Sequence, residues 1–185
     1  RLPTWRTRRS TSRPPSAEGG ACGKTGMRIG VHAVGRMKAG PERELVDRYF
    51  GRFAKAGPAI GLEFSGISEV AESRARSVDE RRREEAASLE TYRGDAALFL
   101  LDERGKNPTS EDLAQRIARM RDDGRRQAVF AIGGPDGHDA ASRAAADLVI
   151  SFGAQTWPHQ LVRVMLAEQL YRVATILAGH PYPRS

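Results

Sequence analysis

The chain has 185 residues, enough for one domain around a single hydrophobic core. Its single cysteine, Cys22, excludes an internal disulfide and a cysteine-rich zinc site, which is typical of proteins of a reducing cytosol. No run of about 18 apolar residues occurs, so the sequence predicts no membrane-spanning helix. We therefore expect a cytoplasmic protein that has no membrane partner.

The formal net charge of +7 is concentrated at the beginning of the chain. Residues 1–26 contain six basic residues and one acidic residue, whereas residues 27–185 contain 24 basic and 22 acidic residues. Because segment 1–26 is rich in Arg, Ser, Pro and Gly and has no apolar period, we expect a disordered basic tail or a non-native extension before Met27. Organelle transit peptides share this composition, but no amphipathic helix is recognisable here.

Residues 27–185 alternate between strand and helix patterns, taken here in chain order. Strands are expected at 27–34, 61–68, 97–103, 128–134 and 149–153, with continuous apolar runs in the third and fourth that are typical of central strands. Helices are expected at 41–56, within 69–92, after a cap at Thr109 or Ser110, at 142–148 and after 156. This alternation predicts an α/β fold with a doubly wound, mostly parallel sheet.

The helix within residues 156–185 is unusual because it is apolar on nearly every side. Only four of its residues are expected to face water, namely Arg163, Glu168, Gln169 and Arg172. Such a helix has to be buried within its own domain, against a second subunit, or both. Gly179 predicts a left-handed helix stop, and Pro181 follows where a helix cannot continue.

Motifs for several other chemistries are incomplete. The GKT at 23–25 lacks the earlier glycine and the preceding strand of a phosphate loop, and no G-x-G-x-x-G follows the first strand. The four histidines show no paired spacing, so we expect no metal. Neither Ser142 nor Ser151 lies in a nucleophile elbow, which leaves hydrolase chemistry without support.

Three expected strands end in segments rich in glycine or charge. They are LLDERGK at 100–106, IGGPDG at 132–137 and GAQTWPH at 153–159. Glycines allow a close backbone approach to a ligand and positive φ, although IGGPDG alone also fits an ordinary strand-to-helix turn. Because ligands of such sheets bind beyond the carboxyl ends of the strands, the three ends together favour one shared pocket.

These segments, with WPHQLVRVMLAEQLYRVATILAGHPYPR at 157–184, resemble the ribosomal RNA large-subunit methyltransferase H family. The resemblance extends from Met27 to Arg184. Members of this family are SPOUT-class enzymes that methylate N3 of a pseudouridine in the 23S rRNA of the assembled ribosome. The resemblance implies a SPOUT methyltransferase domain at 27–185, a deep trefoil knot at its carboxyl end and a homodimer with a shared active site.

The resemblance also implies a cofactor, S-adenosyl-L-methionine, and a set of site residues. The implied cofactor-binding residues are Leu101, Asp102, Gly133, Gly134, Gly153, Ala154, Gln155, Thr156, Trp157 and Pro158. The implied catalytic residues are His180, Tyr182 and Arg184, with Tyr182 and Arg184 suited to base stacking and phosphate contact. Pro183 stands where most members have a second histidine, and no residue is an obvious acceptor for the N3 proton.

Two other functions remain open at this point. Pro183 also suits a ribosome-binding protein that has kept the fold and lost catalysis, which a measurement of cofactor affinity and methyl transfer would distinguish. The alternative is a SPOUT methyltransferase that acts on tRNA. Parallel assays on ribosomes and bulk tRNA would separate that activity from methylation of the ribosome.

Overall fold

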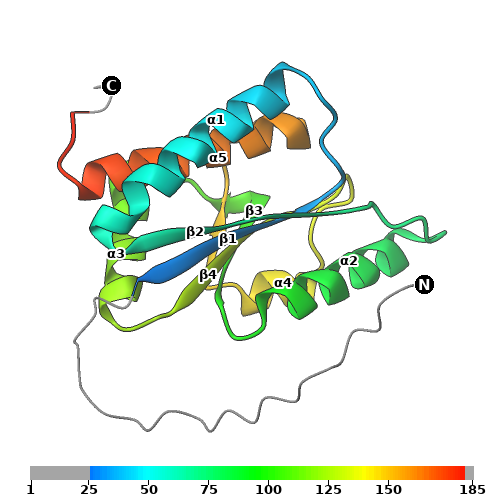
Figure 1. Ribbon diagram of the computed structural model, residues 1–185. Helices are drawn as coiled ribbons and strands as arrows, with labels where there is room; N and C mark the ends of the chain where they lie inside the picture. Colours follow the sequence, from blue (N-terminus) through cyan, green and yellow to red (C-terminus); the bar gives the residue numbers. More distant parts are fainter. Residues whose placement is uncertain (1–25, 182–185) are drawn as a thin grey trace, which may run out of the picture.

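The computed structural model describes residues 26–181 of the chain. The segment 1–25 and the predicted site residues Tyr182 and Arg184 lie outside the described residues. A five-stranded sheet with helices on both faces forms the domain (Figure 1). Among the residues described, no helix has both the length and the apolar character needed to cross a membrane.

All paired strands are parallel, in the order β2-β1-β4-β3-β5, which confirms the predicted α/β class. The strands are β1 (Met27–Val34), β2 (Leu62–Val70), β3 (Ala97–Lys106), β4 (Gln127–Ile132) and β5 (Leu148–Ile150). The helices are α1 (Pro41–Ala56), η1 (Gly57–Ile60), α2 (Val78–Arg93), α3 (Ser110–Asp122), α4 (Ala140–Ala145) and α5 (His159–Leu177).

Several predicted boundaries were wrong: some loops were taken for regular structure, whereas β2 and β3 extend beyond the predicted residues 68 and 103, to Val70 and Lys106. Residues 71–77 are not helical, because α2 begins only after Ser77, whose side chain accepts from the Glu80 amide in a capping box. Residues 133–134 and 151–153 are loops rather than strand ends, and α4 spans 140–145 rather than 142–148. The Thr109 cap of α3 is confirmed, since its hydroxyl accepts from Asp112 N.

The two faces of the sheet bury different amounts of apolar surface. Alternate residues of β1, β3 and β4 point to a large cluster under α1, α3 and α5, which includes Phe53, Phe99 and Phe130. The opposite face packs a small cluster against α2, centred on Leu89 and Leu98. Figure 1 shows α1 and α5 on one side of the sheet and α2 and α4 on the other.

Helix α5 does not expose its polar residues as predicted. Arg163 is 1% exposed, so the expectation that it faces water was wrong. Its guanidinium donates to the Glu69 carboxylate at 2.7 Å and to the carbonyl oxygens of Val34 and Gly35 at 2.7 and 2.5 Å. These partners, at the ends of β1 and β2, replace water around the buried charge. The predicted left-handed stop at Gly179 is confirmed by its φ of 66°.

Strand β3 contains a four-residue bulge that shapes the carboxyl edge of the sheet. Leu101 and Lys106 are both paired with Ile150, so residues 102–105 leave the ladder and return to the same residue of β5. Ser151 N donates to Lys106 O at 2.7 Å. At Gly105, a Cβ would lie 2.6 Å from the Ile150 carbonyl carbon, so only glycine allows this return.

Candidate active site

A cavity of about 260 Å³ lies at the carboxyl ends of β3, β4 and β5, where the sequence predicted a pocket. Seven residues implied by the resemblance line it: Leu101, Asp102, Gly133, Gly134, Gln155, Thr156 and Trp157. Gly153, Ala154 and Pro158 belong to the same loop as Trp157 but do not line the cavity, and His180 lies beyond α5, outside the lining. The structure therefore brings the three predicted strand ends together.

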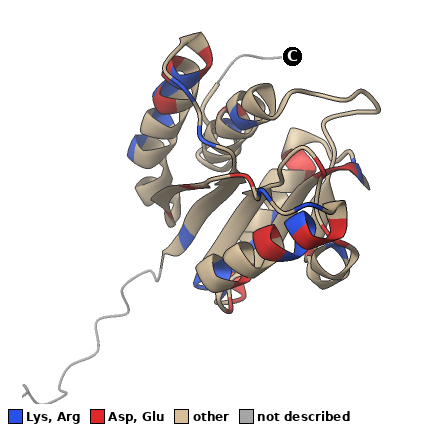
Figure 2. Ribbon diagram, turned by 90° about the vertical axis from the view of Figure 1, so that its right-hand side faces the viewer, with Lys and Arg blue, Asp and Glu red and all other residues tan. Residues whose placement is uncertain are grey.

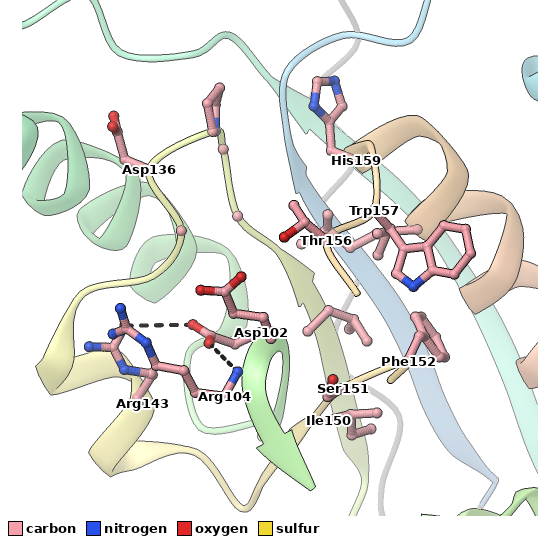
Figure 3. Close-up of a pocket in the computed structure, with 18 of the residues that line it drawn as sticks. Asp102, Arg104, Asp136, Arg143, Ile150, Ser151, Phe152, Thr156, Trp157 and His159 are labelled. Atoms are coloured by element: carbon pink, nitrogen blue, oxygen red, sulfur yellow. Dashed lines mark hydrogen bonds and ion pairs between the residues drawn. The ribbon is translucent and has the colours of Figure 1, made fainter. Parts of the chain in front are cut away.

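The β3 bulge forms the first wall and holds the Asp102 carboxylate in place. Oδ1 accepts from Arg104 N at 3.0 Å, and Oδ2 lies 3.6 Å from a guanidinium nitrogen of Arg143 (Figure 3). The Asp102 side chain is only 7% exposed. Arg143 also donates to the His138 carbonyl, which fixes the guanidinium beside the carboxylate. Sequence reasoning missed Arg143 because nothing in the short α4 pattern points toward the β3 end.

The glycine-rich loop after β4 forms the second wall. Only Gly137 has a left-handed conformation, with φ 71°, so the expectation of positive φ fails for Gly133 and Gly134. Their importance is steric. A Cβ at Gly134 would lie 3.0 Å from both Val34 Cγ1 and Glu85 Oε2, and one at Gly133 would lie 3.3 Å from the His138 ring. The loop therefore packs closely against the α2 side and turns its backbone to the cavity.

Two arginines of α2 tie this loop to the helix. Arg81 donates to both carboxylate oxygens of Asp136, at 2.6 and 3.2 Å, and Arg82 donates to the Asp136 carbonyl oxygen at 2.9 and 2.7 Å. The Arg81 hydrogen bonds hold the pKa of Asp136 below its ordinary value. Arg82 also lines the cavity, a contact hidden in the sequence by the charged pattern of α2.

The segment between β5 and α5 forms the third wall. The Ser151 hydroxyl donates to Gly153 O at 2.7 Å and accepts from Gly153 N at 3.2 Å, and Gly153 has φ 115°. This local turn directs the following residues over the cavity. Figure 3 shows Trp157 and Phe152 together on one side, with Asp102, Arg104 and Arg143 on the other. Trp157 is 39% exposed, so its indole offers an apolar surface at the rim.

Two buried histidines lie behind the glycine-rich loop. His32 of β1 is 2% exposed and neither of its ring nitrogens has a hydrogen-bond partner. Burial, with a smaller contribution from His138, lowers the pKa of His32 to about 4. Burial also lowers the pKa of His138, whose Nε2 has no partner. Both imidazoles are therefore neutral at pH 7 and support the loop from the α2 side.

The cavity combines main-chain groups of three loops with an aromatic surface and one oriented carboxylate. This combination is suited to holding a small organic ligand by shape and main-chain hydrogen bonds. Within residues 26–181, no cluster of three or more His, Cys, Asp or Glu side chains could hold a metal ion.

A family model described as "Predicted SPOUT methyltransferase" matches residues 27–183. The chain belongs to the SPOUT methyltransferase family. The protein named Ribosomal RNA large subunit methyltransferase H of Chelativorans sp. (strain BNC1) is 70% identical over 158 residues, which cover 85% of this chain and 91% of that protein. Its namesake in Mesorhizobium japonicum is 67% identical over 160 residues, covering 86% and 100%.

These relatives confirm the resemblance stated from the sequence. Among solved structures, a probable methyltransferase from Bordetella pertussis Tohama I matches with a TM-score of 0.45 and 15% identity, over 82% of this chain and 98% of that chain. The family model covers all three loops that line the cavity, including the glycine-rich loop and Trp157.

Proposed function

We propose that the chain is an S-adenosyl-L-methionine-dependent methyltransferase that modifies N3 of a pseudouridine in the 23S rRNA of the assembled ribosome. The observation that carries the proposal is the meeting of three separate motifs around one cavity. Membership of the SPOUT family and 67–70% identity to relatives named Ribosomal RNA large subunit methyltransferase H support it. Such a substrate would place the protein in the cytoplasm.

The residues that line the cavity suit the proposed cofactor. The backbone of Gly133 and Gly134, where a Cβ has no room, would approach the ligand with its amide and carbonyl groups. Leu101 and Trp157 would supply apolar contact, and Asp102 a fixed carboxylate. We assign Gly153, Ala154, Gln155, Thr156 and Pro158 to the loop that closes over it. The bound cofactor supplies an electrophilic methyl group, while the protein supplies position and electrostatics.

We further propose that the carboxyl end forms a trefoil knot and that the enzyme is a homodimer. The knot follows from the resemblance, and the pairing of Leu101 and Lys106 with Ile150 brings the β3 bulge against the end of β5, just before the loop to α5. On α5, Leu161 is 38% exposed, and Val164 and Met165 are only partly buried. A second copy would cover this apolar surface, as expected for a helix apolar nearly all round.

We assign the catalytic contacts to His180, Tyr182 and Arg184 as a hypothesis that follows the resemblance. His180 lies just after α5, where its amide donates to Thr175 O at 2.9 Å, so the tail leaves the helix from a fixed point. A guanidinium at 184 suits both a phosphate and the face of a base. The N3 proton would pass to solvent, since no base is indicated.

Labelled methyl transfer to ribosomes from a strain that lacks this modification tests the proposal, with bulk tRNA assayed in parallel. Transfer to ribosomes but not tRNA is the expected result. Transfer to tRNA alone would show a different SPOUT activity. Cofactor binding in calorimetry without transfer to either RNA would favour a ribosome-binding protein that has lost catalysis.

Replacement of the tail arginine sharpens this test. We predict that Arg184→Ala leaves cofactor affinity and dimerisation unchanged but slows methyl transfer to ribosomes. The transition-state free energy should rise by about 1–3 kcal/mol, as for the loss of one phosphate or stacking contact. Steady-state transfer, measured beside a cofactor titration, gives the answer. An unchanged rate would remove Arg184 from the proposed site.

A further inference from the structure

We propose that the loops after β1 and β2, residues 35–40 and 71–77, form a phosphate-binding surface on which RNA docks beside the cavity. The identity of that RNA rests on the proposed function. The loops begin side by side, since Gly35 N donates to Val70 O at 2.8 Å. Figure 2 views the molecule from the side on which these loops lie, with Lys and Arg in blue.

Four cations on these loops are not bound by other side chains of the described residues. Arg36, Lys38, Arg74 and Arg76 are all exposed, and within residues 26–181 no hydrogen bond or ion pair of their side chains is formed. The neighbouring Arg81 instead binds the Asp136 carboxylate. Exposed cations without acidic partners are the groups that replace counterions on a nucleic-acid backbone.

The nearby carboxylates are held by other partners, and among the described residues none of them forms an ion pair with these four cations. Glu69 binds Arg43 and Arg163. Glu84 accepts from the Ser73 hydroxyl at 2.5 Å, and Glu85 from the Ser73 amide at 3.2 Å.

Five other acids lie on or beside this surface: Glu72 belongs to the second loop, and Glu42, Glu44, Asp79 and Glu80 to the first turns of α1 and α2. Glu72 also interacts electrostatically with the buried Arg163, and the other four acids occupy first helical turns, where the helix dipole favours them. The two loops themselves carry four cations against one acid, although residues 27–185 as a whole are nearly balanced in charge.

The first loop is held firmly at its base. Glu69 Oε1 accepts from Met37 N at 3.2 Å, and Arg43 donates to Met37 O at 3.0 Å. The Met37 side chain is buried, at 6% exposure, which leaves the residues on either side, Arg36 and Lys38, facing outward. A fixed backbone lowers the entropy cost of ordering these cations on a ligand.

The second loop is held in a similar way from α2. Arg81 donates to the carbonyl oxygens of Ala75 and Arg76 at 3.1 and 3.4 Å, and Ser73 bonds to α2 as described above. Ser73 and Ala75 are partly buried, whereas Arg74 and Arg76 are exposed, so inward and outward residues alternate here too. Both loops thus present a pair of cations from a pinned backbone.

The position of this surface suits a substrate whose target base enters the cavity. A Cβ at Gly35 would lie 3.6 Å from His159 Nε2, and His159 lines the cavity. Arg82, one residue after the Arg81 that pins the second loop, lines it as well. RNA bound along the loops would therefore have its neighbouring nucleotides at the mouth. Phosphate contacts of this kind set orientation rather than sequence specificity.

The test uses two double variants of the full chain, Arg36→Gln/Lys38→Gln and Arg74→Gln/Arg76→Gln, with Arg125→Gln/Arg126→Gln as the matched control. The control cations are also exposed and unpaired among the described residues. They directly precede β4, however, and so lie at the amino ends of the strands, away from the cavity. Binding to purified large ribosomal subunits is measured as a function of salt, together with KM and kcat for methyl transfer and cofactor affinity by calorimetry.

Each loop variant is expected to weaken ribosome binding about tenfold and to lower the salt slope by about 2, one for each lost phosphate contact. KM for ribosomes should rise, while kcat and cofactor affinity stay unchanged. The control should change binding less than about twofold, because its charges lie beyond the screening length from the site. Loop variants that bind as the control does would overturn the inference.

Weaker binding with an unchanged salt slope would also overturn it, since the loops would then contact a ribosomal protein rather than phosphate. If the wild-type chain binds subunits but transfers no methyl group, the proposed function fails, and the binding comparison still decides the role of the two loops.

Discussion

The two faces of the sheet bury polar side chains in opposite ways. Under α1 and α5, Arg163 is buried as an ion, with the Glu69 carboxylate and two carbonyl oxygens around it. Under α2, His32 and His138 are buried close together with three of their four ring nitrogens unpartnered. The first arrangement requires Arg163 to be charged, whereas the second requires both histidines to be neutral.

This difference assigns the faces different roles. Arg163 and its three partners connect α5 to the ends of β1 and β2, so they fix the position of the helix that follows the third cavity wall. The histidines support the glycine-rich loop only while they stay neutral. A buried polar residue near a strand end can thus stabilise the fold without contacting a ligand. The stability of variants on each face tests these two roles.

The largest expected effect on stability comes from removing the ion pair between Arg163 and Glu69. Arg163→Met should lower the free energy of unfolding by about 3–5 kcal/mol, because it leaves the partly buried Glu69 carboxylate without its closest cation and two carbonyl oxygens without their donor. Urea denaturation at pH 7 measures the change.

The control for Arg163 is Arg93→Met, which removes a pair between Arg93 and the exposed Glu90 on the surface of α2. That variant should lose less than about 1 kcal/mol. Equal losses in the two variants would show that the cluster under α5 is no more important than a surface ion pair.

The next largest effect is the pH dependence of stability caused by His32, on the α2 face of the sheet. The pKa of His32 is about 4 in the folded chain and 6.5 ordinarily, so between these values the unfolded chain binds more protons. Stability is therefore fully present above about pH 6.5 and falls as the pH drops toward 4, by about 2.5 kcal/mol at pH 4.5 from this residue alone.

Urea denaturation of the wild type and of His32→Leu at pH 7 and pH 4.5 isolates this contribution, since both proteins share the same carboxylates. The stability difference between them should shift by that amount in favour of the variant at low pH. A shift in the opposite direction would mean that His32 is charged in the folded state.

A smaller effect is expected where the α2 face meets the cavity. Gly134→Val places side-chain atoms against Val34 and Glu85, so the loop has to move toward the cavity. We expect affinity for S-adenosyl-L-methionine to fall at least about tenfold, or about 1.4 kcal/mol. Gly51→Val is the control, since its Cβ meets nothing within 4 Å on α1. Calorimetry that gives wild-type affinity for Gly134→Val would contradict our assignment of the loop.

The sequence predicted the order and type of most elements because apolar periodicity and caps are local signals. The strand at 27–34 and the helix at 41–56 have the predicted bounds. The resemblance named residues of all three cavity walls. By contrast, the burial of Arg163 and the approach of Arg82 and Arg143 to the cavity depend on residues far away along the chain, such as Glu69 and Asp136. No periodic pattern contains that information.

The bulge at 102–105 has a consequence for which changes in length the chain tolerates. Leu101 and Lys106 are both paired with Ile150, so this loop is fastened at each end to a single residue of β5. Surface loops usually accept insertions and deletions readily. Here one added or deleted residue would shift Lys106 off its partner or push Gly105 into the neighbouring backbone. The cavity wall that carries Asp102 is thus as fixed in length as a strand, although it has the form of a loop.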